Sequence, residues 1–118
     1  MELRVLSDDG DVLRLEVIGS IVEVEATPES DPMRQLLDNR GHPPAVVLSL
    51  AKTPFIDSSG LSWLVTTHRR FCEAGGKLVL HSTPPTLLDL LKMMRLELAL
   101  NLADDESAAL RAIRGESP

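Results

Sequence analysis

The sequence predicts a single α/β domain built around a mixed β-sheet. A length of 118 residues suits one domain, and a hydrophobic content of 43% with few aromatic residues supplies an aliphatic core. Short apolar runs alternate with longer segments of helical periodicity, a pattern typical of parallel strands joined by right-handed helical crossovers. We therefore expect residues 1–118 to form one domain, with about four helices mainly on one face of the sheet.

A β-hairpin opens the predicted sheet and makes it mixed. The ranges Glu2–Ser7 and Asp11–Ile18 alternate apolar and polar residues, and residues 8–10 between them read Asp-Asp-Gly, a tight-turn signal. The Leu and Val side chains of the second strand are expected to face the core. Ile21–Val24 offers a short extension of this strand.

The remaining elements follow from apolar periodicity and from the residues that start or stop helices. Pro, Ser, Thr and Asp mark helix starts, whereas Gly marks helix ends. Runs rich in Val and Leu indicate strands buried on both faces. The expected elements are a helix from about Pro32 to Arg40 with Met33, Leu36 and Leu37 on one face, a strand over Ala45–Leu50, a helix from about Ser58 to Gly75, a strand over Lys77–His81, a helix capped by Ser82 or Thr83 with Leu87, Leu91 and Met94 buried, a strand through Leu98, Leu100 and Leu102, and a last helix that starts at residues 104–106 and holds Ala109 and Ile113.

The composition excludes several classes of function. With 12 basic and 18 acidic side chains, the net charge of −6 disfavours binding to nucleic acid. The single cysteine, Cys72, excludes an internal disulfide and a multi-thiolate metal site, and the three histidines lack metal-binding spacing. No signal peptide or run of about 20 apolar residues is present. We expect a cytoplasmic protein with no membrane partner and no cofactor.

The most informative stretch is residues 55–61, which read Phe-Ile-Asp-Ser-Ser-Gly-Leu. It delivers Asp57, Ser58 and Ser59 to the N-terminus of the strongest predicted helix. Free N–H groups at a helix N-terminus accept hydrogen bonds to such side chains, and the same positive end favours an added phosphate. From chemistry alone a serine here is a helix cap, a phosphoacceptor, or first the one and then the other, and the cap is the commoner use.

Helical periodicity predicts that the only Trp of the chain lies on the outer face of this helix. An apolar stripe formed by Leu61, Leu64, Val65, His68 and Cys72 is expected to face the core, and Trp63 falls roughly opposite it. Because Trp is a favoured anchor at protein interfaces, this outer face is a candidate binding surface. The alternative is that Trp63 packs under a neighbouring loop or in an oligomer contact. The residues expected to share the outer face with Trp63 are Ser59, Thr66, Thr67 and Arg70.

The stretch Asp57-Ser58-Ser59-Gly60-Leu61, with apolar strands over residues 46–50 and 77–80 on either side, resembles the STAS domain. This family includes the bacterial anti-sigma factor antagonists. The resemblance implies a STAS fold and binding to an anti-sigma factor that is also a serine kinase. That kinase phosphorylates a Ser of the motif and so ends the binding, and a phosphatase restores it. The resemblance implies Ser58 as the acceptor, with Ser59 as the fallback.

The resemblance also implies roles for the neighbouring residues. Asp57 orients the loop and helps to present the acceptor, and Gly60 permits close approach of the kinase backbone. Independently of the resemblance, the helical periodicity described above predicts that Trp63, Thr67 and Arg70 extend the contact face. The domain needs no cofactor because ATP belongs to the partner, and a homodimer stays open.

Two other functions stay open as alternatives. One is a non-switching STAS scaffold in a larger signalling complex. The weaker one is a small serine hydrolase that uses Asp57, Ser58 and either His68 or His81. The chain lacks a Gly-x-Ser-x-Gly motif, and no histidine has a spacing that demands proximity to the serines. The identity of the kinase, the sigma factor and the regulated process does not follow from the sequence.

Overall fold

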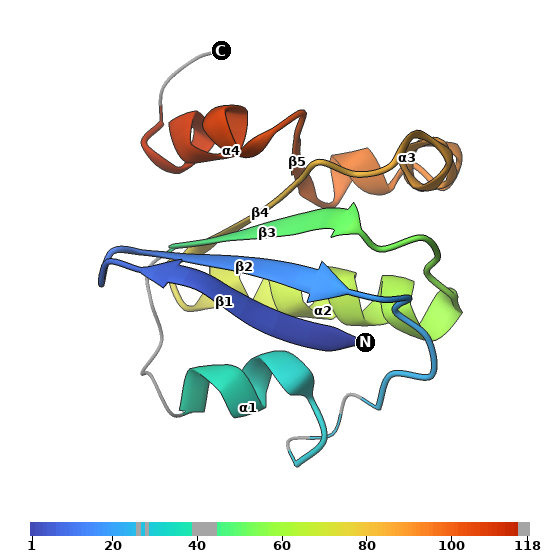
Figure 1. Ribbon diagram of the computed structural model, residues 1–118, viewed down its shortest axis with the longest axis horizontal. Coiled ribbons are helices and arrows are strands. Elements are labelled where there is room, and N and C mark those ends of the chain that lie inside the picture. The colour runs from blue at the N-terminus through green and yellow to red at the C-terminus, as the bar shows by residue number, and fades with distance from the viewer. Residues whose placement is uncertain (26, 28, 39–44, 116–118) are drawn as a thin grey trace.

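The computed structural model describes residues 1–25, 27, 29–38 and 45–115, and it confirms the predicted α/β class. Five strands form one sheet in the order β1-β2-β3-β4-β5 (Figure 1). The pair β1–β2 is antiparallel and the three following pairs are parallel, so the sheet is mixed. The elements are β1 (Glu2–Asp8), β2 (Val12–Ile18), α1 (Pro32–Asp38), β3 (Ala45–Lys52), α2 (Ser58–Glu73), β4 (Lys77–His81), α3 (Pro85–Met93), a 3-10 turn η1 (Leu96–Leu98), β5 (Asn101–Ala103) and α4 (Glu106–Ile113).

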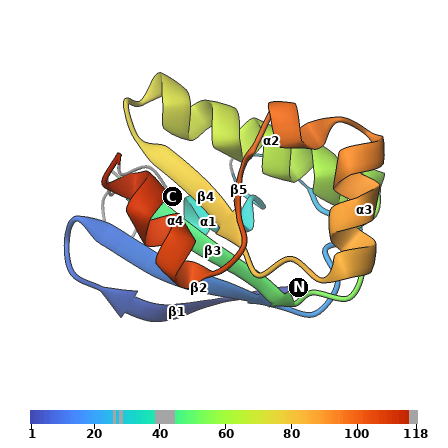
Figure 2. The same cartoon turned by 90° about the horizontal axis from the view of Figure 1, so that it is seen from above.

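The two faces of the sheet carry cores of different size. Successive side chains of a strand point to opposite faces, so Leu78 and Leu80 of β4 face one side and Val79 faces the other. The larger core packs the sheet against α1, α2 and α3, and the smaller one packs Val47 and Val79 against Ala109 of α4. Figure 2 shows α2 and α4 on opposite sides of β4. Three of the four helices therefore lie on one face, as predicted.

The chain that follows β2 runs alongside the segment that follows β3. Ile21 forms an isolated parallel bridge with Ile56, whereas residues 22–25 form no strand. The predicted strand extension over Ile21–Val24 is therefore limited to one bridging residue. This pairing brings the loop after β2 to the start of α2 (Figure 1).

The N-terminus of α1 is fixed by Asp31. Its Oδ1 accepts a hydrogen bond from the N–H of Met33 at 3.0 Å, which satisfies a free donor of the first turn. Met33 and Leu37 are buried, as predicted. The predicted end of this helix near Arg40 lies outside the described residues.

The region after β4 departs from the sequence prediction in two ways. Pro84, and neither Ser82 nor Thr83, is the N-cap of α3, and the Ser82 hydroxyl instead lies 2.8 Å from Nδ1 of His81. A side-chain cap is less needed here because Pro85, at the first helical position, has no N–H to satisfy.

The second departure concerns the leucines near the C-terminus. The strand predicted through Leu98, Leu100 and Leu102 is instead the 3-10 turn η1 followed by the short strand β5. Arg95, which lies between α3 and η1, adopts a left-handed backbone conformation, and the chain changes direction there. As a result Leu98 is 80% exposed, and Met94, which was predicted to be buried, is 53% exposed.

This difference in burial predicts opposite effects of two leucine truncations. Leu91 is fully buried in the larger core, whereas Leu98 is exposed. We expect Leu91→Ala to lower the free energy of unfolding by about 2–5 kcal/mol, and Leu98→Ala to change it by less than about 0.5 kcal/mol. Urea unfolding of both variants checks this, and similar losses for the two would contradict the placement of α3 and η1.

Candidate functional site

The site begins where the chain leaves β3 and enters α2. Asp57 is the N-cap of α2, with an extended backbone, and its Oδ1 accepts a hydrogen bond from the N–H of Gly60 at 2.9 Å. A carboxylate here satisfies one free donor of the first turn and complements the positive end of the helix. The helix-cap interpretation of the motif is thus correct for Asp57.

The same carboxylate joins α2 to the loop that follows β2. Its Oδ2 accepts a hydrogen bond from the N–H of Glu23 at 3.0 Å. The backbones of the two segments are also paired, since Ile21 N–H donates to the carbonyl of Phe55 at 2.9 Å and Asp57 N–H donates to the carbonyl of Ile21 at 3.1 Å. Asp57 therefore fixes both the start of α2 and the position of the loop beside it.

The two serines of the motif have different surroundings. The hydroxyl of Ser59 donates to Oδ1 of Asp57 at 2.6 Å and accepts from the N–H of Val24 at 2.8 Å, and Ser59 is half-buried. Ser58 is the first residue of α2 and is exposed. Among the described residues its hydroxyl has no hydrogen-bond partner. Of the two candidate acceptors, only Ser58 presents an unengaged hydroxyl to solvent.

Gly60 allows a close approach, but the approach is made by this chain itself. A Cβ at this position would lie 2.4 Å from the carbonyl oxygen of Ile21 and 2.7 Å from Cγ2 of Ile56. Gly60 is buried under the loop after β2. The expectation that Gly60 makes room for a kinase backbone is therefore wrong: the room is taken by Ile21.

The prediction that Trp63 faces outward is also wrong. Trp63 is 1% exposed, and its Nε1–H donates to Oδ1 of Asp31 at 3.0 Å. The guanidinium of Arg70 pairs with Oδ2 of the same carboxylate at 2.7 Å, and Thr67 is buried. These three residues of α2 are directed at α1 and the residues before it, so they do not form an outer contact face.

The face of α2 was assigned wrongly because its buried side contains small and polar residues. Cys72 is exposed and His68 is half-buried, so the apolar stripe chosen from the sequence is rotated from the true one. The helix packs against both the sheet and α1, and Gly60 and Thr67 are buried without being hydrophobic. Five of the buried residues follow the helical spacing i, i+3, i+4, i+7 and i+11, and Leu61 lies beside the first of them. The buried residues of α2 are Gly60, Leu61, Trp63, Leu64, Thr67 and Phe71.

Apart from Ser58 and Thr66, the surface that adjoins Ser58 is formed by residues that were not predicted to belong to it. An open groove of about 350 Å³ runs between α2 and the end of α3. Two large apolar side chains close in sequence to lining residues are exposed: Phe55, three residues before Ser58, is 54% exposed, and Met93, next to Met94, is 81% exposed. The polar stripe at i, i+4 and i+8 from Ser58 is a signal that could have revealed this face. The groove is lined by Ser58, Leu61, Ser62, Val65, Thr66, Arg69, Met94 and Leu96.

The structure does not assemble the hydrolase set. His81 lies on the face of the sheet that carries α4, because it follows Val79 by two residues in β4, whereas α2 covers the opposite face. His68 lies ten residues along α2 from Ser58, a rise of about 15 Å, and its Nε2 is 3.6 Å from Sγ of Cys72. Neither histidine is placed to act as a base toward Ser58.

The described residues offer neither a metal site nor a membrane span. No group of three or more His, Cys, Asp or Glu side chains in that part of the chain could hold a metal ion. No helix within the described ranges is long and apolar enough to span a bilayer.

The electrostatics of the site are set by hydrogen bonds to Asp57. The hydroxyl of Ser59, together with the N–H groups of Glu23 and Gly60, lowers the pKa of Asp57 below its ordinary value of 3.8, against the opposing effect of burial. The carboxylate is therefore ionised at neutral pH and can accept all of these hydrogen bonds.

Comparison with known proteins identifies the family. A family model described as the STAS domain matches residues 7–109. The chain belongs to the STAS domain family. The match covers all five strands in part or in full and includes the Asp57–Gly60 motif. A search of curated proteins gave no significant match.

Solved structures share the STAS fold with this chain. An anti-sigma factor antagonist from Mycobacterium paratuberculosis is 24% identical with a TM-score of 0.74, over 96% of this chain and 95% of that one. An RsbS variant from Moorella thermoacetica is 18% identical with a TM-score of 0.70, over 98% and 97%. Unphosphorylated SpoIIAA, an anti-sigma factor antagonist, is 16% identical with a TM-score of 0.70, over 99% and 100%. At these identities the likeness establishes the fold.

The lowered pKa of Asp57 predicts a specific pH dependence of stability. A carboxyl group whose pKa is lower in the folded state stabilises the fold above its unfolded-state pKa, and that contribution is lost as the pH falls through the folded-state pKa. We expect Asp57→Asn to be less stable than the native domain at pH 7, with the difference shrinking below about pH 4. Urea unfolding of both proteins from pH 7 to strong acid checks this, and a difference that stays constant would contradict it.

Proposed function

We propose that this STAS domain is a protein-binding regulator of the anti-sigma factor antagonist type, switched by phosphorylation of Ser58. The observation that carries the proposal is the contrast between the two serines of the motif. Ser58 is exposed and, within the described residues, unbonded, whereas Ser59 is held by Asp57 and Val24. A kinase must reach and orient the acceptor oxygen, so Ser58 is the acceptor and Ser59 is the less accessible fallback.

The structural neighbours support a role for charge at such a serine. SpoIIAA of Bacillus, at 15% identity and a TM-score of 0.63, has been solved in a phosphorylated form. The RsbS protein from Moorella thermoacetica was solved as a variant in which glutamate replaces a serine. In this chain, Ser58 stands at the helix N-terminus, where the dipole and free N–H groups tolerate a phosphate.

The partner that we infer is an anti-sigma factor that is also a serine kinase, with a phosphatase that reverses the modification. The contact surface that the geometry favours runs from Phe55 past Ser58 into the groove between α2 and α3. It combines exposed apolar groups with polar ones, a mixture typical of protein interfaces. Trp63 and Thr67 are omitted from this surface because they are buried, and Arg70 because it is paired with Asp31. The exposed residues that we assign to it are Phe55, Ser58, Ser62, Arg69 and Met94.

Phosphorylation would act on this surface without rearranging the domain. A phosphate adds a charge of about −1.5 to −2 at neutral pH. In a complex that presses Ser58 against the partner, this charge must lose water or meet repulsion, which destabilises the complex. The unphosphorylated domain therefore binds the anti-sigma factor, and the phosphorylated domain is released. The domain supplies a surface and an acceptor, and the chemistry of transfer belongs to the kinase.

We expect Ser58→Asp to weaken binding to the cognate kinase by about a hundredfold, which is about 2.7 kcal/mol. Ser58→Ala should bind like the native domain but should not be released by ATP. Ser107→Asp is a matched control, because Ser107 is an exposed serine in the first turn of α4, on the opposite face of the sheet. Titration calorimetry of the three variants with the purified kinase checks these expectations.

Equal affinities of Ser58→Asp and Ser58→Ala would overturn the switch and favour a non-switching STAS scaffold. An equal loss of binding in Ser107→Asp and Ser58→Asp would show a general effect of charge rather than an effect at the site. The control therefore separates an effect of negative charge at Ser58 from a general effect of added negative charge.

A further inference from the structure

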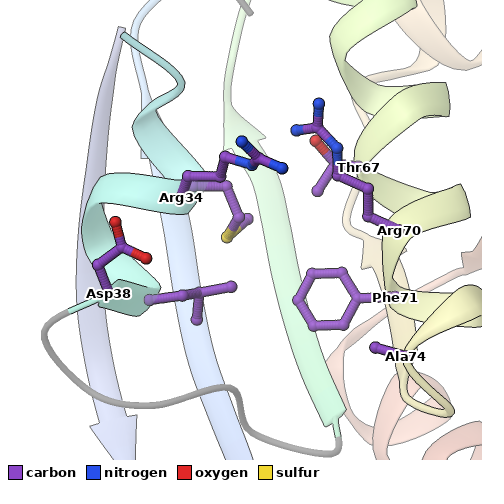
Figure 3. Close-up of a pocket in the computed structure, with 8 residues that line it drawn as sticks. Arg34, Asp38, Thr67, Arg70, Phe71 and Ala74 are labelled. Atoms are coloured by element: carbon purple, nitrogen blue, oxygen red, sulfur yellow. The ribbon is translucent and has the colours of Figure 1, made fainter. Parts of the chain in front are cut away.

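A second concave site lies between α1 and α2, toward the end of α2 that is far from Ser58 (Figure 3). Its volume is about 380 Å³, which falls in the usual size range of small-molecule pockets. Nothing in the proposed switch uses this pocket. It is lined by Met33, Arg34, Leu37, Asp38, Thr67, Arg70, Phe71 and Ala74.

The pocket has an apolar part and a cationic part. Met33, Leu37 and Phe71 supply hydrophobic walls. Above them, the guanidinium groups of Arg34 from α1 and Arg70 from α2 point toward one another across the gap, as Figure 3 shows. One wall is therefore suited to hydrocarbon and the opposite side to negative charge.

The charges around the pocket leave one guanidinium without a counter-ion. Arg70 is paired with Asp31 at 2.7 Å, whereas no carboxylate of the described residues pairs with the side chain of Arg34. The carboxylate of Asp31 is also engaged by the indole N–H of Trp63 and the N–H of Met33. Asp38 also lines the pocket, but its carboxylate forms no ion pair with Arg34 among the described residues. The unpaired positive charge of Arg34 therefore favours an anion on this side of the pocket.

A polar group in the wall of the pocket also lacks a partner. Thr67 is 3% exposed, and its buried Oγ1 has no hydrogen-bond partner among the described residues. Buried hydroxyl groups are normally hydrogen-bonded, because leaving one unpaired costs free energy. The wall of the pocket thus contains one hydroxyl group whose hydrogen-bonding capacity is unused.

We propose that this pocket binds a small amphipathic anion: a carboxylate, sulfonate or phosphate monoester attached to an aromatic or aliphatic body. The anionic group lies between Arg34 and Arg70, because guanidinium groups bind such oxyanions with paired hydrogen bonds. The apolar body lies against Met33, Leu37 and Phe71. The proposal is independent of the switch at Ser58.

The test uses 1-anilinonaphthalene-8-sulfonate, an aromatic sulfonate that becomes fluorescent in apolar surroundings, with neutral N-phenyl-1-naphthylamine as its uncharged counterpart. We expect the native domain to bind the sulfonate saturably at one site. Arg34→Gln should weaken that binding about tenfold, because it removes a charged hydrogen bond. The same variant should leave the affinity for the neutral probe nearly unchanged. Arg4→Gln is the matched control, because Arg4 is an exposed arginine of β1 that lines neither this pocket nor the groove beside Ser58.

Nuclear magnetic resonance locates the bound sulfonate independently of affinity. We expect shifts of the backbone signals of Thr67, Phe71 and Ala74. Shifts confined to Ser62 and Met94 would place the probe in the groove beside Ser58 and overturn the proposal. It is also overturned by the absence of saturable binding, by an unchanged affinity of Arg34→Gln for the sulfonate, or by an equal loss of affinity in Arg4→Gln.

Discussion

The carboxylate of Asp57 is the interaction on which the site depends. It accepts hydrogen bonds from the N–H of Gly60, the N–H of Glu23 and the hydroxyl of Ser59 at the same time. These contacts start α2, hold the loop after β2 against it, and occupy the hydroxyl of Ser59. Because one serine is engaged and the other is not, the motif presents a single acceptor, Ser58. The hydrogen bonds that position the carboxylate also keep it ionised at neutral pH.

Asp31 plays a similar structural part at the other side of α2. It begins α1 by accepting from the N–H of Met33, and it also binds Trp63 and Arg70 of α2. Each of the two carboxylates therefore combines a helix cap with a link to a distant segment. One link supports the serine motif, and the other holds Arg70, which lines the α1–α2 pocket. Short acidic side chains, rather than core packing alone, determine where the loops of this domain lie.

The fold was predictable because it follows from local patterns. The strand Lys77–His81 and the start of α2 at Ser58 match the sequence prediction, since apolar periodicity, glycine stops and cap residues are short-range signals. The buried face of α2 was not predictable in this way. Trp63 is buried because its indole N–H reaches Asp31, 32 residues earlier, and no local pattern shows that contact. The role of Gly60 likewise depends on Ile21, which the topology brings beside it.

The account is tested most directly by locating the phosphate after the native domain is incubated with ATP and the serine kinase that binds it. Fragmentation mass spectrometry of the peptide that contains residues 57–60 distinguishes the two serines. We expect the native domain to carry phosphate on Ser58 alone, because Asp57 and Val24 hold the hydroxyl of Ser59 in hydrogen bonds. Phosphate on Ser59 of the native domain would contradict it.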